Sequence, residues 1–556
     1  MACKNALPSM EKDRILAGEE EPVHDVNIGN MILNALKSRP DFIGQIDAET
    51  DEQTTYRQML ENSVKCALWL KKEILHKNIV ISICTCHQML SYIPFLAGLY
   101  IGAIINPWDP KYFEDETRVM YFLVEYEPEV IFIDKNNYLT LVRVIQHLNI
   151  SSQTIIPPKI ITFGKVEGIE DTSLELILKG RFDKSKINKF YCKDYNPMEI
   201  MATMFSATAT NYPGKTHIRY YAFTYPSNQE VPAMSSGDIG LWYGSLSWPY
   251  SLILTVRSIV SHVTVIKCLK FYDENMYNAI EKYKVKWVFL QSEMCNQLFR
   301  TDIRMYNVSS LKQLVFGDSA IDCNIYKKLI EHFTNASIVQ VYSISEAGII
   351  VAYQRNSNRI GSSGHLAKNV NLIIINDKKT VGPNVLGEIW YKLVCKWCDA
   401  KTCKLPYCNS RRRKDNNMPI STPITATWHC TGDYGYYEED REIFIIDKTK
   451  HLINYRMFRI SPIRIENVLR SHPAVSEVIV KAVPDSKHGQ VPMAYVTIRG
   501  RIKVTELLKE KLAKELMKLI TESLPDMCKL RGGLYFKKDM PYLPNGKIDR
   551  ELVQSY

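Results

Sequence analysis

Four short segments contain the residue types that catalysis or ligand binding would require. Hydroxyl and amide side chains are grouped with a lysine in residues 206–215, and a carboxylate ends Tyr342-Ser343-Ile344-Ser345-Glu346. An aspartate ends Thr431-Gly432-Asp433, and Lys547 follows an Asn-Gly pair. Hydroxyls and lysines are suited to binding anions, whereas carboxylates bind Mg²⁺ or accept hydrogen bonds from hydroxyl groups.

Taken one at a time, these segments have ordinary structural explanations. Gly and Asp favour turns, so residues 431–433 are typical of a plain turn. Asn-Gly is a strong hairpin signal, and a lysine beside it is normally a surface residue. Glu346 differs because it follows a predicted strand, and ligands of an open α/β sheet commonly bind where the strands end.

The elements that must position these residues alternate along the chain. Short β-rich runs alternate with helical patterns from about residue 75 to 345, which predicts parallel sheets covered by helices, the α/β class. After residue 450 the pattern changes to an α+β unit. The predicted strands are residues 79–83, 129–134, 159–163, 263–266, 286–290, 337–341, 478–483 and 492–498, and the predicted helix after them carries a stripe of Leu508, Leu512, Leu516, Leu519 and Ile520 and is closed by Pro525.

The longest apolar stretch, residues 89–107, approaches the ~20 residues of a membrane-spanning helix. It contains Pro94, Gly98 and Gly102, and it follows a β-branched run. A buried strand followed by a buried helix, the start of a βαβ unit, explains this pattern better. We therefore expect no transmembrane span.

Composition indicates an ordinary globular protein. Of 556 residues, 46% are hydrophobic and 23% are charged, which excludes wholesale disorder, collagen and coiled coil. The formal net charge of +10 is too dilute for a nucleic-acid footprint, so no nucleic-acid partner is expected. The 14 cysteines come without a signal peptide, which favours reduced thiols in an intracellular compartment.

In their order along the chain, the four segments resemble the adenylate-forming (AMP-binding) superfamily, particularly its insect luciferase-like and 4-coumarate-CoA ligase-like acyl-CoA synthetases. The resemblance extends from about residue 28 to 553 and includes Trp428-His429-Cys430-Thr431-Gly432-Asp433 and Asp447-Lys448-Thr449-Lys450-His451. It implies a large N-terminal body of β-sheets layered with helices, residues 1–448, and a small α+β C-terminal lid domain, residues 449–556.

The resemblance also implies a two-step reaction. The carboxylate of a hydrophobic acid attacks the α-phosphate of ATP to give an acyl-adenylate, and the thiol of coenzyme A then displaces AMP. ATP, Mg²⁺ and coenzyme A are the expected cofactors, and a small-molecule carboxylic acid is the expected partner. The triphosphate charge must be neutralised, so a cation and hydrogen-bond donors should converge on it.

The resemblance assigns roles to individual residues. Glu346 would hold Mg²⁺, and Lys547 would bridge the carboxylate and the phosphate as charge develops. Asp433 would accept both ribose hydroxyls, and Lys450 would be the hinge about which the lid rotates. The other expected nucleotide-binding residues are Ser206, Thr208, Thr210, Lys215, Tyr342, Ser345 and Lys448, the last of which stands where the family usually has arginine.

The predicted phosphate loop departs from the family pattern Ser-Gly-Thr-Thr-Gly-x-Pro-Lys-Gly. Ala207 and Thr210 stand at glycine positions, where glycine lets backbone N–H groups wrap the phosphates, and Gly214-Lys215 inverts the usual Lys-Gly. Two outcomes are open: a slower or weaker ligase, or an inactive relative that binds a hydrophobic acid or a nucleotide. The three dispersed reacting groups, Glu346, Asp433 and Lys547, favour the enzyme.

The substrate and the compartment are less defined. Residues 247–250 replace the family's aromatic-pocket histidine, so we expect a fatty or other hydrophobic carboxylate and no light emission. A cytoplasmic location is expected. The family also suggests a peroxisome, but Gln554-Ser555-Tyr556 is not a Ser-Lys-Leu type address.

A cysteine cluster lies outside the family pattern. Cys395, Cys398, Cys403 and Cys408 have zinc-knuckle spacing, and four thiolates could hold Zn²⁺ tetrahedrally. The basic run 411–414 follows, so a zinc knuckle that binds RNA is the alternative from another functional class. Incidental thiols are the competing explanation, because cysteine is abundant in this chain and the glycines common in knuckles are missing.

Overall fold

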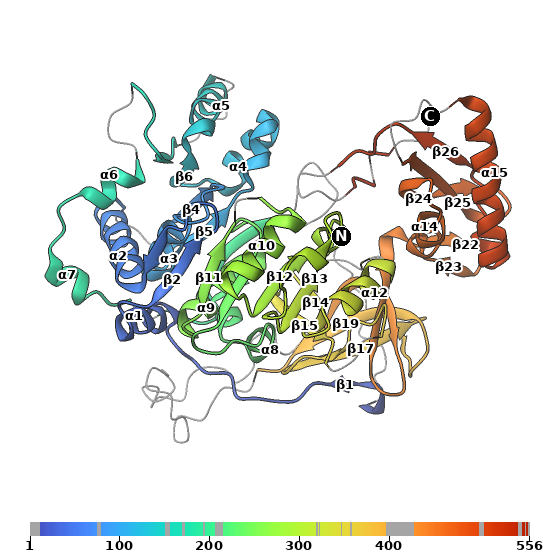
Figure 1. Ribbon diagram of the computed structural model, residues 1–556, viewed down its shortest axis with the longest axis horizontal. Coiled ribbons are helices and arrows are strands. Elements are labelled where there is room, and N and C mark those ends of the chain that lie inside the picture. Colours follow the sequence, from blue (N-terminus) through green and yellow to red (C-terminus); the bar gives the residue numbers. More distant parts are fainter. Residues whose placement is uncertain are drawn as a thin grey trace.

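The computed structural model contains an α/β body and a C-terminal α+β unit, which confirms the predicted fold class (Figure 1). The described strands form four sheets. The structure describes residues 12–74, 79–150, 156–168, 173–192, 195–205, 215–268, 270–317, 321, 323–345, 347–355, 359–395, 428–499, 505–542, 548–550 and 552–553.

The largest sheet lies at the centre of the body. Its strand order is β16-β15-β14-β13-β12-β10-β11-β2-β3, and the strands from β14 to β2 are parallel. Parallel strands are covered on both faces, which explains the apolar run at residues 287–290 and the mostly apolar run at 338–341, in which the polar Gln340 is buried as well. The bounds are β16 His365–Leu366, β15 Ile349–Tyr353, β14 Ser337–Ile344, β13 Gln313–Gly317, β12 Trp287–Gln291, β10 Ile239–Trp242, β11 Thr264–Lys267, β2 Ile43–Asp47 and β3 Gln53–Thr55.

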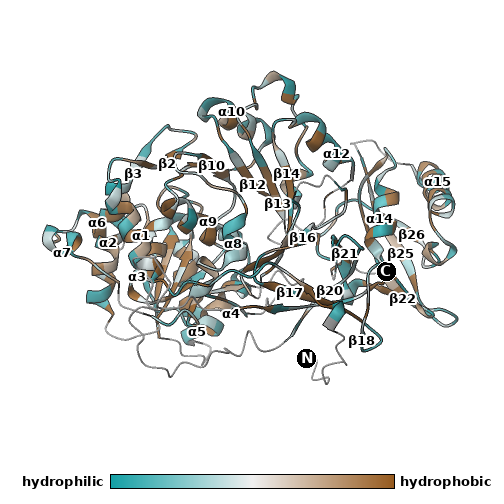
Figure 2. Cartoon of the chain, turned by 90° about the horizontal axis from the view of Figure 1, so that it is seen from below, coloured by the Kyte–Doolittle hydropathy of each residue, from teal (hydrophilic) through white to brown (hydrophobic). Residues whose placement is uncertain are grey.

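Two apolar clusters cover the faces of this sheet. Helices α10 (Asp273–Tyr283) and α12 (Cys323–His332) pack on one face, where Ile280 and Leu329 are buried. The other face carries an aromatic cluster around Trp242 and Phe289, to which α9 (Pro249–Val260) contributes Tyr250. Figure 2 shows the apolar residues of these strands inside the body.

A second sheet has the order β7-β6-β4-β5-β8-β9. Helix α2 begins with a capping box, because Thr55 and Gln58 each bond the backbone of the other. The bounds are β7 Lys159–Phe163, β6 Val130–Asp134, β4 Val80–Cys84, β5 Ile104–Pro107, β8 Ile200–Phe205 and β9 Lys215–Arg219, with the helices α1 Ile28–Ser38, α2 Tyr56–Glu73, α3 Tyr92–Ile101, α4 Glu116–Tyr126, α5 Tyr138–Ile150, α6 Leu174–Lys179, α7 Lys184–Asn188 and, at the central sheet, α8 Pro226–Glu230 and α11 Ser292–Cys295.

The long apolar stretch belongs to this second sheet. Residues 89–107 contain helix α3 and also strand β5, which pairs in parallel with β4. The helix ends at Gly102, whose φ of 77° is readily adopted by glycine. The stretch is therefore the helix and second strand of one βαβ unit, and among the described residues no helix is long and apolar enough to cross a bilayer.

A third sheet joins the start of the described chain to its later part. Its order is β1-β17-β19-β20-β21, and β18 pairs with β17. The bounds are β1 Leu16–Ala17, β17 Val370–Asn376, β18 Lys379–Thr380, β19 Gly387–Leu393, β20 His429–Tyr437 and β21 Ile443–Lys448.

The C-terminal sheet lies apart, at one end of the molecule (Figure 1). Its order is β23-β22-β25-β24, with β26 beside β25. Helix α15 buries Leu512, Leu516 and Ile520 as predicted, but Leu508 is 44% exposed because the helix has begun only two residues earlier. The bounds are β22 Ile453–Tyr455, β23 Phe458–Ile460, α14 Pro462–Arg470, β24 Val475–Asp485, β25 Gly489–Ile498, α15 Glu506–Ser523 and β26 Leu534–Lys537. The predicted division at 448/449 falls between β21 and β22.

Candidate nucleotide site

Asp433 lies inside strand β20 and not in the plain turn that residues 431–433 would suggest when taken alone. Gly432 has φ of 71°, and a side chain there would be strained even though the space around it is open. The Thr431 hydroxyl donates to the Ile389 carbonyl at 2.9 Å and accepts from the Asp433 N–H at 3.0 Å. These bonds and the glycine fix an irregular stretch of strand that presents the aspartate.

The structure brings together three of the predicted site residues. The Asp433 carboxylate is almost completely buried. The Tyr342 hydroxyl donates to its Oδ2 at 2.5 Å, and the Lys448 Nζ lies 2.7 Å from its Oδ1. Lys448 is the register partner of Asp433 across the β20–β21 pair, whereas Tyr342 comes from β14 of the central sheet. The carboxylate therefore lies where two sheets meet.

This geometry suits a ligand that offers two adjacent hydroxyl groups. Oδ2 of Asp433 accepts from Tyr342 and Oδ1 lies beside Lys448. An ionised carboxylate can accept further hydrogen bonds on each oxygen. The Lys448 side chain is 50% exposed, so it can move aside or bind a ligand without losing its hydration. A vicinal diol such as ribose fits these donor and acceptor positions.

Replacement of Tyr342 by phenylalanine tests this arrangement. It removes the donor to a buried carboxylate, so the free energy of unfolding should fall by ~1.5–3 kcal/mol in urea. Tyr535→Phe is the matched control, because Tyr535 is half exposed. Because a ribose hydroxyl can replace the lost donor, Mg-ATP should restore part of the loss. An unchanged stability would contradict the assigned hydrogen bond.

The end of β14 presents the next predicted residue. Ser345 follows the strand in a turn closed by the Gly348 N–H, which donates to the Ser345 carbonyl at 3.1 Å. Ser345 thus lies three residues after Tyr342, at the carboxyl edge of the central parallel sheet. Glu346, the predicted Mg²⁺ ligand, lies outside the described residues.

The predicted phosphate loop connects β8 to β9. Phe205 and Lys215 are register partners, so residues 206–214 join the ends of an antiparallel pair. Ser206, Thr208 and Thr210 lie outside the described residues. The Lys215 ammonium contacts Glu125 at 2.9 Å and lies 5.0 Å from the Tyr126 ring centroid. These contacts are with the end of α4 and not with another of the predicted site residues.

The predicted hinge is bordered by an aspartate that sequence reasoning did not single out. Asp447 is buried and accepts from the Lys448 N–H at 2.7 Å and from the Ser461 hydroxyl at 3.0 Å, and His451 Nδ1 lies 3.3 Å away. Lys450 is exposed. Ser461 precedes α14, which lies beside β21 (Figure 2). Asp447 therefore ties the end of the third sheet to the start of the C-terminal unit.

The segment around Lys547 is fixed on both sides. Tyr542 and Ile548 form an antiparallel bridge, the pairing expected of the predicted Asn-Gly hairpin. Arg550 binds both carboxylate oxygens of Glu466 at 2.7 Å. Lys547 itself lies outside the described residues, so its position relative to Asp433 stays a prediction.

Two further predictions concern Trp248 and the cysteine cluster. Trp248 and Tyr250 are buried against Phe289, with ring centroids 5.2 and 4.6 Å from the phenylalanine ring. Burial raises the pKa of the Cys395 thiol to about 12, so without a metal ion this group is a neutral thiol. The other three cysteines of the predicted knuckle lie outside the described residues, and the described residues contain no cluster that could hold a metal ion.

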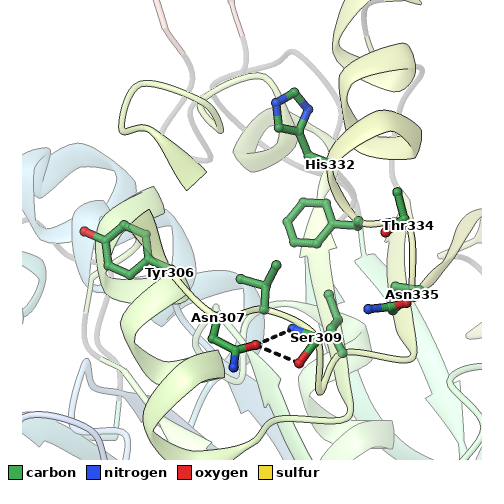
Figure 3. A pocket seen from close by; sticks show the side chains of 10 residues that line it. Tyr306, Asn307, Ser309, His332, Thr334 and Asn335 are labelled. Carbon is green, nitrogen blue, oxygen red and sulfur yellow. Dashed lines mark hydrogen bonds between the residues drawn. The ribbon is translucent and has the colours of Figure 1, made fainter. Parts of the chain in front are cut away.

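A separate pocket of about 220 Å³ lies at the other end of the central sheet (Figure 3). It is lined by residues that precede β13 and β14, including Tyr306, Asn307 and His332. The Asn307 side chain is occupied locally, because its Oδ1 accepts from the Ser309 N–H and hydroxyl. The pocket is at the amino ends of the strands, away from Tyr342 and Asp433.

Comparison with known proteins agrees with this architecture. The chain is 24% identical to luciferin 4-monooxygenase of Photuris pensylvanica over 98% of both chains. It is 22% identical to 4-coumarate-CoA ligase 1 of Narcissus pseudonarcissus over 96% of this chain and 93% of the relative. The crystal structure of the anthranilate CoA ligase AuaEII with anthranoyl-AMP has a TM-score of 0.75 at 16% identity and covers 96% of this chain and 97% of that chain.

Family models match both parts of the chain. The model of the AMP-binding enzyme matches residues 34–394, and the model of the AMP-binding enzyme C-terminal domain matches residues 464–547. The first match alone covers more than half of the chain and includes Tyr342 and Ser345. The protein is therefore a member of the AMP-binding, adenylate-forming enzyme family.

Proposed function

We propose that this protein is an ATP- and Mg²⁺-dependent ligase that converts a hydrophobic carboxylic acid to an acyl-adenylate and then to a coenzyme A thioester. The observation that carries the proposal is the buried Asp433 carboxylate, which accepts from Tyr342 and Lys448 and fits a ribose diol. Relatives named as CoA ligases support the same reaction.

In this proposal the nucleotide lies along the carboxyl edge of β14. Asp433 accepts the ribose hydroxyls, with Tyr342 and Lys448 beside it. Ser345 and the phosphate-loop residues Ser206, Thr208, Thr210 and Lys215 donate to the phosphates. Glu346 would hold Mg²⁺, which neutralises phosphate charge when bound.

The C-terminal unit acts as a lid in the same proposal. We assign residues 1–448 to the body and 449–556 to the lid, with the hinge at Lys450. Lys547 reaches the reacting carboxylate and phosphate when the lid closes. The salt bridge of Arg459 with Glu388, at 3.6 Å, is one existing contact between the two units.

The altered phosphate loop leaves a second candidate, a relative that binds an acid or a nucleotide without turnover. Lys215 favours this candidate in part, because its ammonium pairs with Glu125. Thermal unfolding with Mg-ATP distinguishes a protein that binds the nucleotide from one that does not. A ligand at 100 times its Kd adds ~2.7 kcal/mol, so a shift in Tm is expected and its absence at millimolar ATP would favour a relative that binds only the acid.

Restoring glycine in the phosphate loop should raise turnover. The double variant Ala207→Gly, Thr210→Gly gives the backbone conformations that let N–H groups face phosphates, and we expect an increase of about tenfold or more in kcat/KM for ATP. Gly382→Ala is the control for a change of glycine content elsewhere, because the space around Gly382 is open and its φ is not positive. A lower rate for the double variant would contradict the impaired-loop interpretation.

The decisive experiment is pyrophosphate release with a panel of carboxylic acids. Wild-type protein with Mg-ATP should release pyrophosphate only when a suitable acid is present, and coenzyme A should then yield a thioester detectable by mass spectrometry. Pyrophosphate release without thioester would limit the function to adenylation. Neither product with any acid, despite ATP binding, would assign the protein to the inactive candidate.

A further inference from the structure

A buried ion pair lies three residues after Lys547 in the sequence. Lys547 is outside the described residues, but residues 548–550 are described, and the Arg550 guanidinium donates to both carboxylate oxygens of Glu466 at 2.7 Å each. The Glu466 side chain is only 3% exposed. Two parallel bonds between a planar guanidinium and a carboxylate fix both distance and orientation. The pair therefore holds Arg550 in a defined place on helix α14.

Strand β24, which lies beside α14 in the C-terminal unit, binds both members of the pair (Figure 1). The Val480 N–H donates to Glu466 Oε1 at 2.8 Å, and the Val480 carbonyl accepts from an Nη of Arg550 at 3.3 Å. On the same strand, Lys481 donates to the carbonyl of the buried Val553 at 2.9 Å. The chain that follows Lys547 is thus fixed against the interior of the unit.

The chain that precedes Lys547 is paired with the chain that follows it. Tyr542 and Ile548 form an antiparallel bridge, and the Asp549 N–H donates to the Pro541 carbonyl at 2.8 Å. Because the two segments are bonded to each other, a shift at Arg550 would move both of them. The ion pair therefore controls the position of both chain segments between which Lys547 lies in the sequence.

Helix α14 connects this pair to the candidate nucleotide site. Ser461, the N-cap residue of α14, donates to Asp447 at 3.0 Å. Asp447 comes directly before Lys448, which pairs with Asp433 across the β20–β21 strands. The Asp447 carboxylate also attracts the Arg550 guanidinium. In this orientation of the C-terminal unit, the segment after Lys547 is held relative to the strands that carry Asp433.

Stability alone does not explain the ion pair. Both ions lose hydration when they are buried, and uncharged side chains of similar volume are often as stable in their place. The pair does fix the backbone three residues from a proposed reacting group. A shift of ~1 Å in such a group can lower a rate ~10²-fold, so the rate depends on this position far more than the stability does.

We propose that Glu466 and Arg550 are positioning residues, which fix the segment that carries Lys547 for acyl-adenylate formation. The inference rests on the proposed function and adds to it two residues that belong to the interior of the C-terminal unit. It concerns the first half-reaction only, because the proposed rotation of the lid takes Lys547 away from the site before coenzyme A reacts.

The test removes the ion pair without leaving an unpaired buried charge. The double variant Glu466→Gln, Arg550→Met keeps an acceptor for the Val480 N–H, so its Tm should lie within a few degrees of the wild type. Its kcat for pyrophosphate release should fall ~10²-fold, whereas the Kd for Mg-ATP and thioester formation from synthetic acyl-adenylate should change less than about twofold. Glu506→Gln, Lys509→Met, the same kind of change in an exposed pair of α15, should leave all four values unchanged.

A second measurement does not depend on turnover. Trypsin cleavage after Lys547 requires residues 548–550 to leave their contacts, so mass spectrometry should show it at least ~10-fold faster in the double variant than in the wild type. Cleavage after Lys518, which is exposed on α15, should keep its rate and so exclude global unfolding. Arg550→Lys keeps the charge but not both bonds, so its kcat and its cleavage rate should be intermediate.

Several results would overturn the proposal. Wild-type kcat, or a wild-type rate of cleavage after Lys547, in either folded variant would do so. Equal losses of kcat, ATP binding and thioester formation would also do so, because they would indicate a general structural role. If the wild type released no pyrophosphate with any acid, the proposed ligase would be refuted, and cleavage after Lys547 would still decide whether the pair fixes this segment.

Discussion

Asp433→Asn is expected to lower kcat/KM for ATP in pyrophosphate release by about 10²–10³-fold. The asparagine keeps the shape of the side chain but replaces one acceptor oxygen by an amide NH₂ group, which faces a donor. Hydrogen bonds to a charged partner are worth ~1.5–3 kcal/mol, so losing one and weakening the other accounts for this factor. The loss should lie mainly in the KM for ATP, because the ribose bond forms in the ground state as well as in the transition state.

Asp440→Asn is the matched control for this variant. Asp440 lies in the connection between β20 and β21 and pairs with Arg359 at 2.9 Å, so the change removes a carboxylate charge from the same hairpin, at the end remote from Asp433, without touching the proposed ribose contact. Its kcat/KM for ATP should stay within about twofold of the wild type. If the two variants lost activity equally, a general electrostatic effect would explain the result and the ribose role of Asp433 would be wrong.

Lys547→Ala is expected to abolish adenylate formation, with a loss of ~10²–10³-fold or more in kcat, while the Kd for Mg-ATP changes little. The reason is that the proposed lysine contacts the charge that develops in transfer and makes no bond that free ATP requires. Adenylate formation is measured as pyrophosphate release, and ATP binding is measured by thermal unfolding.

The same variant also separates the two half-reactions. Given synthetic acyl-adenylate and coenzyme A, Lys547→Ala should form thioester at close to the wild-type rate. Lys538→Ala, which removes an exposed lysine of the same unit, should retain both half-reactions. If Lys547→Ala lost ATP binding and both half-reactions to the same extent, Lys547 would stabilise the C-terminal unit and would have no role in the reaction.

Much of the fold could be predicted from the sequence because its strands carry strong local signals. The β-branched runs at 79–83, 129–134 and 159–163 became β4, β6 and β7, since both faces of these parallel strands are buried. The apolar stretch 89–107 was predicted less completely. Its helix is buried almost all round and its strand β5 is apolar except for Asn106, and periodicity cannot divide such a run.

The site was less accessible to sequence reasoning. The contact between Tyr342 and Asp433 joins two sheets, and no local pattern reports such a contact. Residues 431–433 have turn composition, but the Thr431 bonds and the register shift in the β19–β20 pair hold them in a strand.

The hydrogen bonds of Asp447 would affect how fast the C-terminal unit could rotate about Lys450. Its carboxylate binds groups on both sides of Lys450 in the sequence. The Lys448 N–H comes before Lys450, and the side chains of His451 and Ser461 come after it. A swivel at Lys450 would have to release the partners that follow, and the Ser461 bond alone is worth ~1.5–3 kcal/mol. The C-terminal unit would then have one favoured orientation in the free protein. Binding of coenzyme A would have to stabilise the other orientation for the thiol to reach the adenylate.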